Sequence, residues 1–162
     1  MKKYILHPAT FKLDGGAMFG IIPRPLWSKK IKPDEMNRIH MSLRVIYIET
    51  ENKKILIDTG IGDYHTEKFK QQFDIQGMNS PLENILKENH GVSPNEITDI
   101  ILTHLHFDHA GGILSAYGDG PMRLLFPNAR FYTGKEQFER AKKPHARDKA
   151  SYIPALVELL QA

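Results

Sequence analysis

The sequence predicts one mixed α/β (α+β) domain spanning residues 1–162. Three observations indicate this class: a length of 162 residues, a composition that is 41% hydrophobic and 25% charged, and strand-like segments that alternate with helix-like ones. The alternation is irregular, which favours a mixed sheet over repeated βαβ units. A chain of this size buries about 70% of the surface that its unfolded form exposes, enough for a real core.

The first 40 residues are expected to be rich in loops. Pro23, Pro25 and Pro33 oppose a regular helix there, and the Asp-Gly-Gly at 14–16 predicts a turn. A dense run of β-branched and aromatic residues then predicts a strand over 42–49. The run KILID at 54–58 predicts a second strand, and the short turn between the two runs favours a hairpin.

A helix is expected to follow these strands. Ser80 and Glu83 form a predicted capping box with Pro81 at the first helical position, and Gly91 is a plausible end. An apolar stripe lies between them at helical spacing. The same kinds of signal predict strands over 97–103 and 129–132, a helix from a capping box at Thr133 and Glu136 to about Ala141, and a last helix over 154–160.

Four potential metal ligands lie within six residues just after the predicted strand 97–103: His104, His106, Asp108 and His109. Residues two apart in an extended segment point to the same side, so His104 and His106 can converge on one ion. Asp108 and His109 follow as the chain turns and can face a second ion. The Gly-Gly pair at 111–112 would let backbone approach closely. Imidazole and carboxylate together suit zinc, manganese or iron.

The remaining polar residues give weaker signals. Asp58 ends an apolar strand, and two interpretations stay open: a residue that forms the turn, or an acceptor that orients a ligating histidine. The histidines outside the motif lie in polar or loop-like surroundings and are predicted to be surface residues rather than ligands; they are His7, His40, His65 and His90.

Composition and missing motifs exclude several classes of function. The net charge of +3 comes from scattered lysines and arginines, so no nucleic-acid partner is expected. No apolar run approaches the roughly 18 residues of a membrane helix, so no membrane partner is expected either. The sequence contains no nucleophile elbow, P-loop or dinucleotide fingerprint. With no cysteine and no signal-peptide pattern, a cytoplasmic location is the default expectation.

The run His-x-His-x-Asp-His after a buried strand resembles the binuclear metal signature of the metallo-β-lactamase superfamily. Residues 14–20, 54–63 and 128–132 look more specifically like the branch that contains quorum-quenching acyl-homoserine lactonases. The resemblance implies a four-layer αββα sandwich, of which this chain would be the N-terminal half, with a mixed sheet and outer helices. It also implies Zn²⁺ as cofactor at two positions in the complete protein, with Mn²⁺ or Fe²⁺ as possible substitutes.

The same resemblance implies roles for individual residues. His104 and His106 would bind the first metal, and Asp108 and His109 the second. A hydroxide bridging the metals would attack an ester-like bond of a small-molecule substrate, most simply a lactone of the acyl-homoserine type. Asp108 would be the catalytic residue that guides a proton to the leaving group. Two loop residues would border the substrate, unless they are ordinary hydrophobes packed on the core: Met18 and Phe19.

The sequence departs from the family pattern after the motif. In the family, a third histidine for the first metal, a bridging aspartate and a final histidine come from the second half. Here 53 residues (162 minus 109) follow His109, and the sole later histidine, His145, lies in a basic loop. We therefore expect a truncated hydrolase domain that is incomplete at its C-terminus, inactive alone, and prone to self-association through an uncovered sheet. A non-catalytic metal-binding association module, or one half of a split protein, stays open as the alternative.

Overall fold

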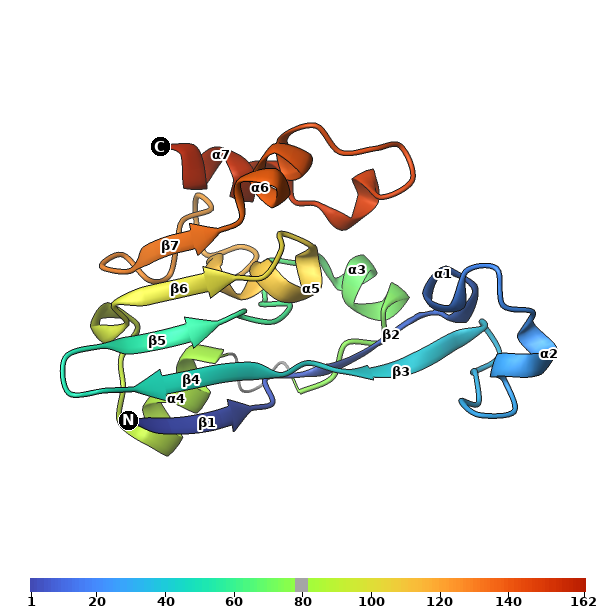
Figure 1. Ribbon diagram of the computed structural model, residues 1–162, viewed down its shortest axis with the longest axis horizontal. Coiled ribbons are helices and arrows are strands. Elements are labelled where there is room, and N and C mark those ends of the chain that lie inside the picture. The colour runs from blue at the N-terminus through green and yellow to red at the C-terminus, as the bar shows by residue number, and fades with distance from the viewer. Residues whose placement is uncertain (78–81) are drawn as a thin grey trace.

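The computed structural model describes residues 1–77 and 82–162 (Figure 1). Its centre is a mixed sheet with the strand order β1-β4-β5-β6-β7. β1, β4 and β5 pair antiparallel, whereas β5, β6 and β7 pair parallel. The mixed α/β class with a mixed sheet is therefore confirmed. The five strands are β1 (Lys2–Leu6), β4 (Val45–Glu49), β5 (Lys54–Ile57), β6 (Asp99–Leu102) and β7 (Arg130–Thr133).

Helices and 3₁₀ turns join these strands and supply the core. Figure 1 places α4 behind β1 and β4, while α6 and α7 lie beyond β7. Leu82 and Leu86 of α4 are buried in the main hydrophobic cluster together with Leu156 and Val157 of α7. The helices of this part of the chain are α3 (Glu67–Gln72), α4 (Leu82–His90), α5 (Phe107–Ala110), α6 (Lys135–Lys142) and α7 (Pro154–Gln161), with 3₁₀ turns at Pro94–Glu96, Gly111–Ile113 and Lys149–Ser151. No helix in the described residues is long and apolar enough to cross a membrane.

The first 40 residues are more regular than the sequence indicated. A two-stranded ribbon, β2 (Thr10–Asp14) with β3 (Arg38–Ser42), carries the short helices α1 (Gly15–Phe19) and α2 (Arg24–Trp27) at its tip. The prolines did not prevent this, because Pro23 is the residue before α2 and Pro25 lies in its first turn, where no backbone N–H is needed. The predicted turn at 14–16 instead starts α1, where the Asp14 side chain accepts a hydrogen bond from the N–H of Ala17.

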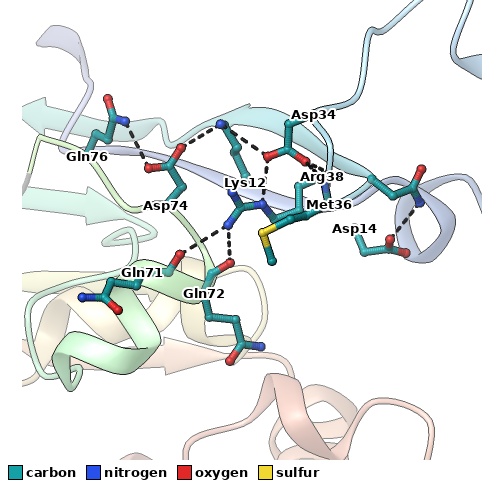
Figure 2. Close-up of polar contacts among 10 residues, drawn as sticks. Lys12, Asp14, Asp34, Met36, Arg38, Gln71, Gln72, Asp74 and Gln76 are labelled. Carbon is teal, nitrogen blue, oxygen red and sulfur yellow. Dashed lines mark hydrogen bonds and ion pairs between the residues drawn. The ribbon is translucent and has the colours of Figure 1, made fainter.

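Charged side chains join this ribbon to the body of the protein (Figure 2). Lys12 Nζ lies 2.7 Å from Asp74 and 3.5 Å from Asp34, and Arg38 Nε lies 2.9 Å from Asp34. The Arg38 guanidinium also donates a 2.6 Å hydrogen bond to the carbonyl of Gln72, the last residue of α3. Each of these surface pairs alone contributes little to stability, because water screens it. Together they fix the position of the ribbon beside α3.

The predicted element boundaries hold in part. The strand expected over 42–49 is interrupted, because β3 ends at Ser42 and β4 begins only at Val45. Gly91 does follow α4, with a left-handed φ of 64° that favours glycine. The capping box predicted at residues 80–83 lies partly outside the described residues. The second predicted capping box is wrong: Gly134 precedes α6 with no side-chain cap, because Thr133 is the last residue of β7.

The two faces of the central sheet differ in cover. On one face, Tyr47, Leu56 and Ile100 stand side by side on neighbouring strands and are fully buried. The opposite face carries a continuous cross-strand row of apolar residues, one from each strand, and most of it is exposed. The row consists of Ile5 (63% exposed), Ile46 (37%), the partly buried Ile57, Ile101 (39%) and Tyr132 (46%).

Candidate metal centre

Three histidine rings gather where the chain leaves β6. The ring centre of His104 lies 4.6 Å from that of His106 and 4.0 Å from that of His109. His106 precedes α5, a single turn that carries Asp108 and His109, and the predicted turn is therefore a short helix. His109 Nε2 lies 3.5 Å from Asp108 Oδ2. The structure thus brings all four residues of the motif into one cluster, and each is partly buried.

Asp58 reaches the cluster from the neighbouring strand. β5 and β6 are parallel, so their carboxyl ends meet at the same edge of the sheet, and Asp58 follows β5 directly. Its backbone has a left-handed φ of 56°, uncommon for a residue other than glycine. Asp58 Oδ2 lies 2.9 Å from His109 Nδ1, which leaves His109 Nε2 for another partner. Of the two interpretations open from the sequence, this geometry favours the acceptor; orientation of a bound metal's ligand stays a prediction.

Burial and nearby charge shift the acidities in this cluster. Desolvation, followed by the neighbouring imidazoles, lowers the pKa of His104, and desolvation lowers the pKa of His106. For His109, desolvation also favours the neutral ring, but the hydrogen bond to Asp58 and the charges of Asp108 and Asp58 outweigh it and raise the pKa. Desolvation opposes ionisation of Asp58, yet hydrogen bonds from His109 and Thr103 outweigh it and lower the pKa. His104 and His106 are therefore favoured as neutral rings, the form that binds metals.

Backbone hydrogen bonds join the segment that contains Asp58 to the segment that carries the motif. The N–H of Thr59 donates to the carbonyl of His109 at 2.8 Å, and the N–H of Gly112 donates to the carbonyl of Gly60 at 3.0 Å. A Cβ on Gly112 would overlap the carbonyl oxygen of Thr59, and one on Gly111 would overlap that of Ile61. The close backbone approach expected at the Gly-Gly pair is confirmed.

The side chains of the cluster are of the chemical types that bind divalent metals. Three imidazoles and one carboxylate lie together, and the Nδ1 atoms of His104 and His109 already have oxygen partners, which leaves the Nε2 atoms for an ion. However, in residues 1–77 and 82–162 no three His, Asp or Glu side chains are arranged to hold one ion. The motif therefore supplies the right donors without a finished coordination shell.

The two residues predicted to border a substrate lie on the ribbon of β2 and β3. Met18 and Phe19 belong to α1 at the tip of the ribbon, where Met18 is 45% exposed. The ring of Phe19 stacks on that of Trp27, with centres 4.9 Å apart and planes at 12°. Their contact with a substrate stays a prediction, and Phe19 is explained here by packing against α2.

The sequence missed three aromatic contacts made by histidines. His65 was predicted at the surface but is 3% exposed, because its ring stacks on that of Phe69 at 4.0 Å. His90 is also partly buried, 4.4 Å from the ring of Tyr4. Tyr152 lies 4.8 Å from the His106 ring and pairs with His106 through a β-bridge. The contacts of His90 and His106 join residues that are 86 (90 minus 4) and 46 (152 minus 106) positions apart, so no local pattern could reveal them. The partner of His65 lies only four residues away, but nothing in the sequence showed that this pair is buried.

The sequence is similar to known metal-dependent proteins in the region that contains the cluster. Residues 44–116 match the metallo-β-lactamase superfamily. An N-acyl homoserine lactonase of Bacillus cereus is 34% identical over 85 residues, which is 47% of this chain and 34% of the relative. One from Bacillus thuringiensis is 38% identical over 74 residues, 40% of this chain and 29% of the relative.

Two solved structures show the same architecture. A probable metal-dependent hydrolase from Staphylococcus aureus superposes with a TM-score of 0.80 at 33% identity, over 94% of this chain and 53% of that one. The dizinc quorum-quenching lactonase AidC, in complex with a product, superposes with a TM-score of 0.70 at 26% identity, over 98% and 54%. The chain spans about half the length of these two proteins. The fold of this chain is therefore the metallo-β-lactamase fold, and residues 44–116 are the part whose sequence matches that superfamily.

Proposed function

We propose that this domain is part of a metal-dependent hydrolase that opens an ester-like bond, with a lactone of the acyl-homoserine type as the substrate. The observation that carries the proposal is the gathering of His104, His106 and His109 beside Asp108, within the span that matches the superfamily. The similarity to N-acyl homoserine lactonases supports the substrate class.

In this proposal His104 and His106 hold one divalent cation, and Asp108 and His109 hold a second, with zinc as the expected metal. Bound divalent cations supply two things to hydrolysis: water that ionises near neutral pH, and polarisation of a carbonyl oxygen. Asp58 keeps the Nδ1 proton of His109 in place and so presents Nε2 to the centre. Asp108, whose Oδ2 lies 3.5 Å from His109 Nε2, would also receive a proton and pass it to the departing alkoxide.

The test is hydrolysis measured with added zinc or manganese on an acyl-homoserine lactone and on a phosphotriester. We expect lactone hydrolysis from the protein extended by the C-terminal half present in its relatives, and almost none from the 162-residue chain. In the extended protein, His106→Ala and Asp108→Ala should each reduce the rate by more than roughly a hundredfold, because even outer residues of metal sites cost 10–100-fold. The exposed His40→Ala is the matched control and should be active.

Other outcomes would change the assignment. Activity of the short chain that Asp108→Ala abolishes would mean that a second copy or another residue completes the centre. Phosphotriester hydrolysis without lactone hydrolysis would contradict the substrate class. Inactivity of both forms, with metal still bound, would favour the non-catalytic association module, the alternative that the exposed face of the sheet supports.

We further propose that the exposed face of the central sheet is covered in the working protein by that C-terminal half. Five apolar side chains aligned across five strands form a surface of the kind that single domains rarely leave in water. About half of each solved relative lies outside the part that this chain matches, which is the length that a second half requires.

The short chain alone should therefore self-associate through this face. Replacing Ile46 and Ile101 together by lysine places two charges in the middle of the apolar row, and we expect the weight-average mass to fall to that of the monomer. Ile21→Lys is the matched control, because Ile21 is fully exposed on the ribbon tip and away from the sheet. Sedimentation equilibrium measures the masses. Loss of association in the control but not in the double variant would contradict the proposal.

A further inference from the structure

We infer that Thr103 is a positioning residue: with Asp58, it holds His104 in the tautomer that carries its proton on Nδ1 and offers Nε2 to a metal. This inference rests on the proposed metal centre and adds a residue to it. Thr103 is the last residue before the motif and is exposed, so its side chain is not explained by packing in the core.

The hydrogen bonds around Thr103 are short and specific. Its N–H donates to Asp58 Oδ1 at 2.8 Å. Its hydroxyl oxygen lies 2.9 Å from Asp58 Oδ1 and 2.8 Å from Oδ2. The same oxygen lies 3.1 Å from His104 Nδ1. Thr103 therefore stands between the carboxylate of Asp58 and the ring of His104.

Counting protons assigns the direction of each bond. A hydroxyl has one proton to donate and lone pairs to accept with, whereas an ionised carboxylate only accepts. The proton of Thr103 must therefore point to Asp58, and its oxygen then accepts from His104 Nδ1–H. In the opposite arrangement the hydroxyl would donate to His104, and its lone pairs would face two carboxylate oxygens less than 3 Å away with no proton between them.

The carboxylate of Asp58 thus fixes the tautomer of two imidazole rings, that of His109 directly and that of His104 through Thr103. His109 Nδ1–H donates to Asp58 directly at 2.9 Å, and His104 Nδ1–H reaches the same group through Thr103. Both rings then present an unprotonated Nε2, the form in which neutral imidazole binds a metal. His104 and His109 belong to different metals in the proposed centre, so Asp58 and Thr103 would couple the two positions.

The test separates the hydroxyl from the shape of the side chain. Thr103→Val keeps the β-branched shape without the hydroxyl, and Thr103→Ser keeps the hydroxyl without the methyl. In metal-free protein at pH 8, two-dimensional ¹⁵N–¹H spectra of the imidazoles report which nitrogen carries the proton. We expect His104 as the Nδ1–H tautomer in the wild-type chain and in Thr103→Ser, and a shift toward Nε2–H in Thr103→Val. His109 is the internal control and should be unchanged in all three.

Zinc affinity gives a second measurement. Competition with a chromophoric chelator should show zinc bound roughly tenfold more weakly by Thr103→Val, with affinity restored in Thr103→Ser. An Nε2–H tautomer of His104 in the wild-type chain would overturn the inference, as would equal behaviour of the valine and serine variants. The tautomer measurement needs neither metal nor turnover, so it decides the role of Thr103 even if zinc binding or hydrolysis fails.

Discussion

Gly112→Ala is expected to lower the free energy of unfolding by roughly 4 kcal/mol, at the upper end of what single substitutions cost. The added Cβ would overlap the carbonyl oxygen of Thr59 and lie 2.8 Å from its carbonyl carbon. Neither partner can yield easily, because both are backbone atoms held by hydrogen bonds. The N–H of Thr59 donates a hydrogen bond to the carbonyl of His109, and the N–H of Gly112 donates one to the carbonyl of Gly60.

The same substitution should disturb the metal centre. Relief of the overlap requires residues 58–60 to move away from the 109–112 segment, which lengthens the contact between Asp58 and His109, now 2.9 Å. Urea unfolding followed by circular dichroism measures the stability, and elemental analysis measures the zinc content. Gly134→Ala is the matched control: a Cβ there meets only Gln137 at an ordinary 3.6 Å, and stability should change by about 0.5 kcal/mol or less. Equal stabilities of the two variants would contradict the prediction.

The sequence predicted most strongly what depends on neighbours in the chain. The strand before the motif, the helix that ends before Gly91 and the helix from Pro154 all follow from local periodicity, caps and breakers, and all are present. The motif itself is local as well: a short segment after β6 places four potential ligand side chains at one edge of the sheet, because a strand end and a single helical turn leave them little freedom.

Features made by distant residues could not be predicted in this way. The ribbon of β2 and β3 forms because residues 10–14 pair with residues 38–42, and the prolines that suggested loops lie in the connection between them. Asp58 had two interpretations because only the parallel pairing of β5 and β6 brings it to His109. In the sequence Thr103 has no feature that distinguishes it from other strand residues, and only its hydrogen bond to Asp58 in the structure indicates a role.

The burial of His65 could not be predicted from the sequence either, and it makes the stability of the protein depend on pH. Its ring is 3% exposed, its Nε2–H donates to the carbonyl of Ile61 at 3.0 Å, and it packs between Tyr64 and Phe69. Burial lowers the pKa of His65 to about 4, against the partly compensating hydrogen bond to Ile61. Asp63 and Lys70 are the charged groups nearby, and their effects on the pKa oppose each other.

The folded protein should therefore lose stability as the pH falls from about 6.5 to about 4. Above pH 6.5, His65 is neutral in the folded and in the unfolded protein. Between about pH 6.5 and pH 4, the unfolded chain binds a proton at His65 that the folded chain does not bind. Below about pH 4, His65 is protonated in both states. A difference of about 2.5 pH units corresponds to about 3 kcal/mol. His65→Gln and His65→Phe do not titrate, so the difference in unfolding free energy between each variant and wild type should change by about that amount between pH 7 and pH 4.

Urea unfolding at closely spaced pH values measures this difference. The two variants differ in what they keep: glutamine retains a donor for the Ile61 carbonyl, whereas phenylalanine retains the aromatic stack on Phe69. Their absolute stabilities should differ for that reason, but their pH dependence should be the same. Stability curves for wild type and both variants that run parallel from pH 7 to pH 4 would show that His65 is protonated as readily in the fold as in the unfolded chain. The ring of Phe107, which follows His106, lies 5.4 Å from that of Phe69 and 6.3 Å from that of His65, so the buried histidine belongs to the aromatic packing next to the metal motif.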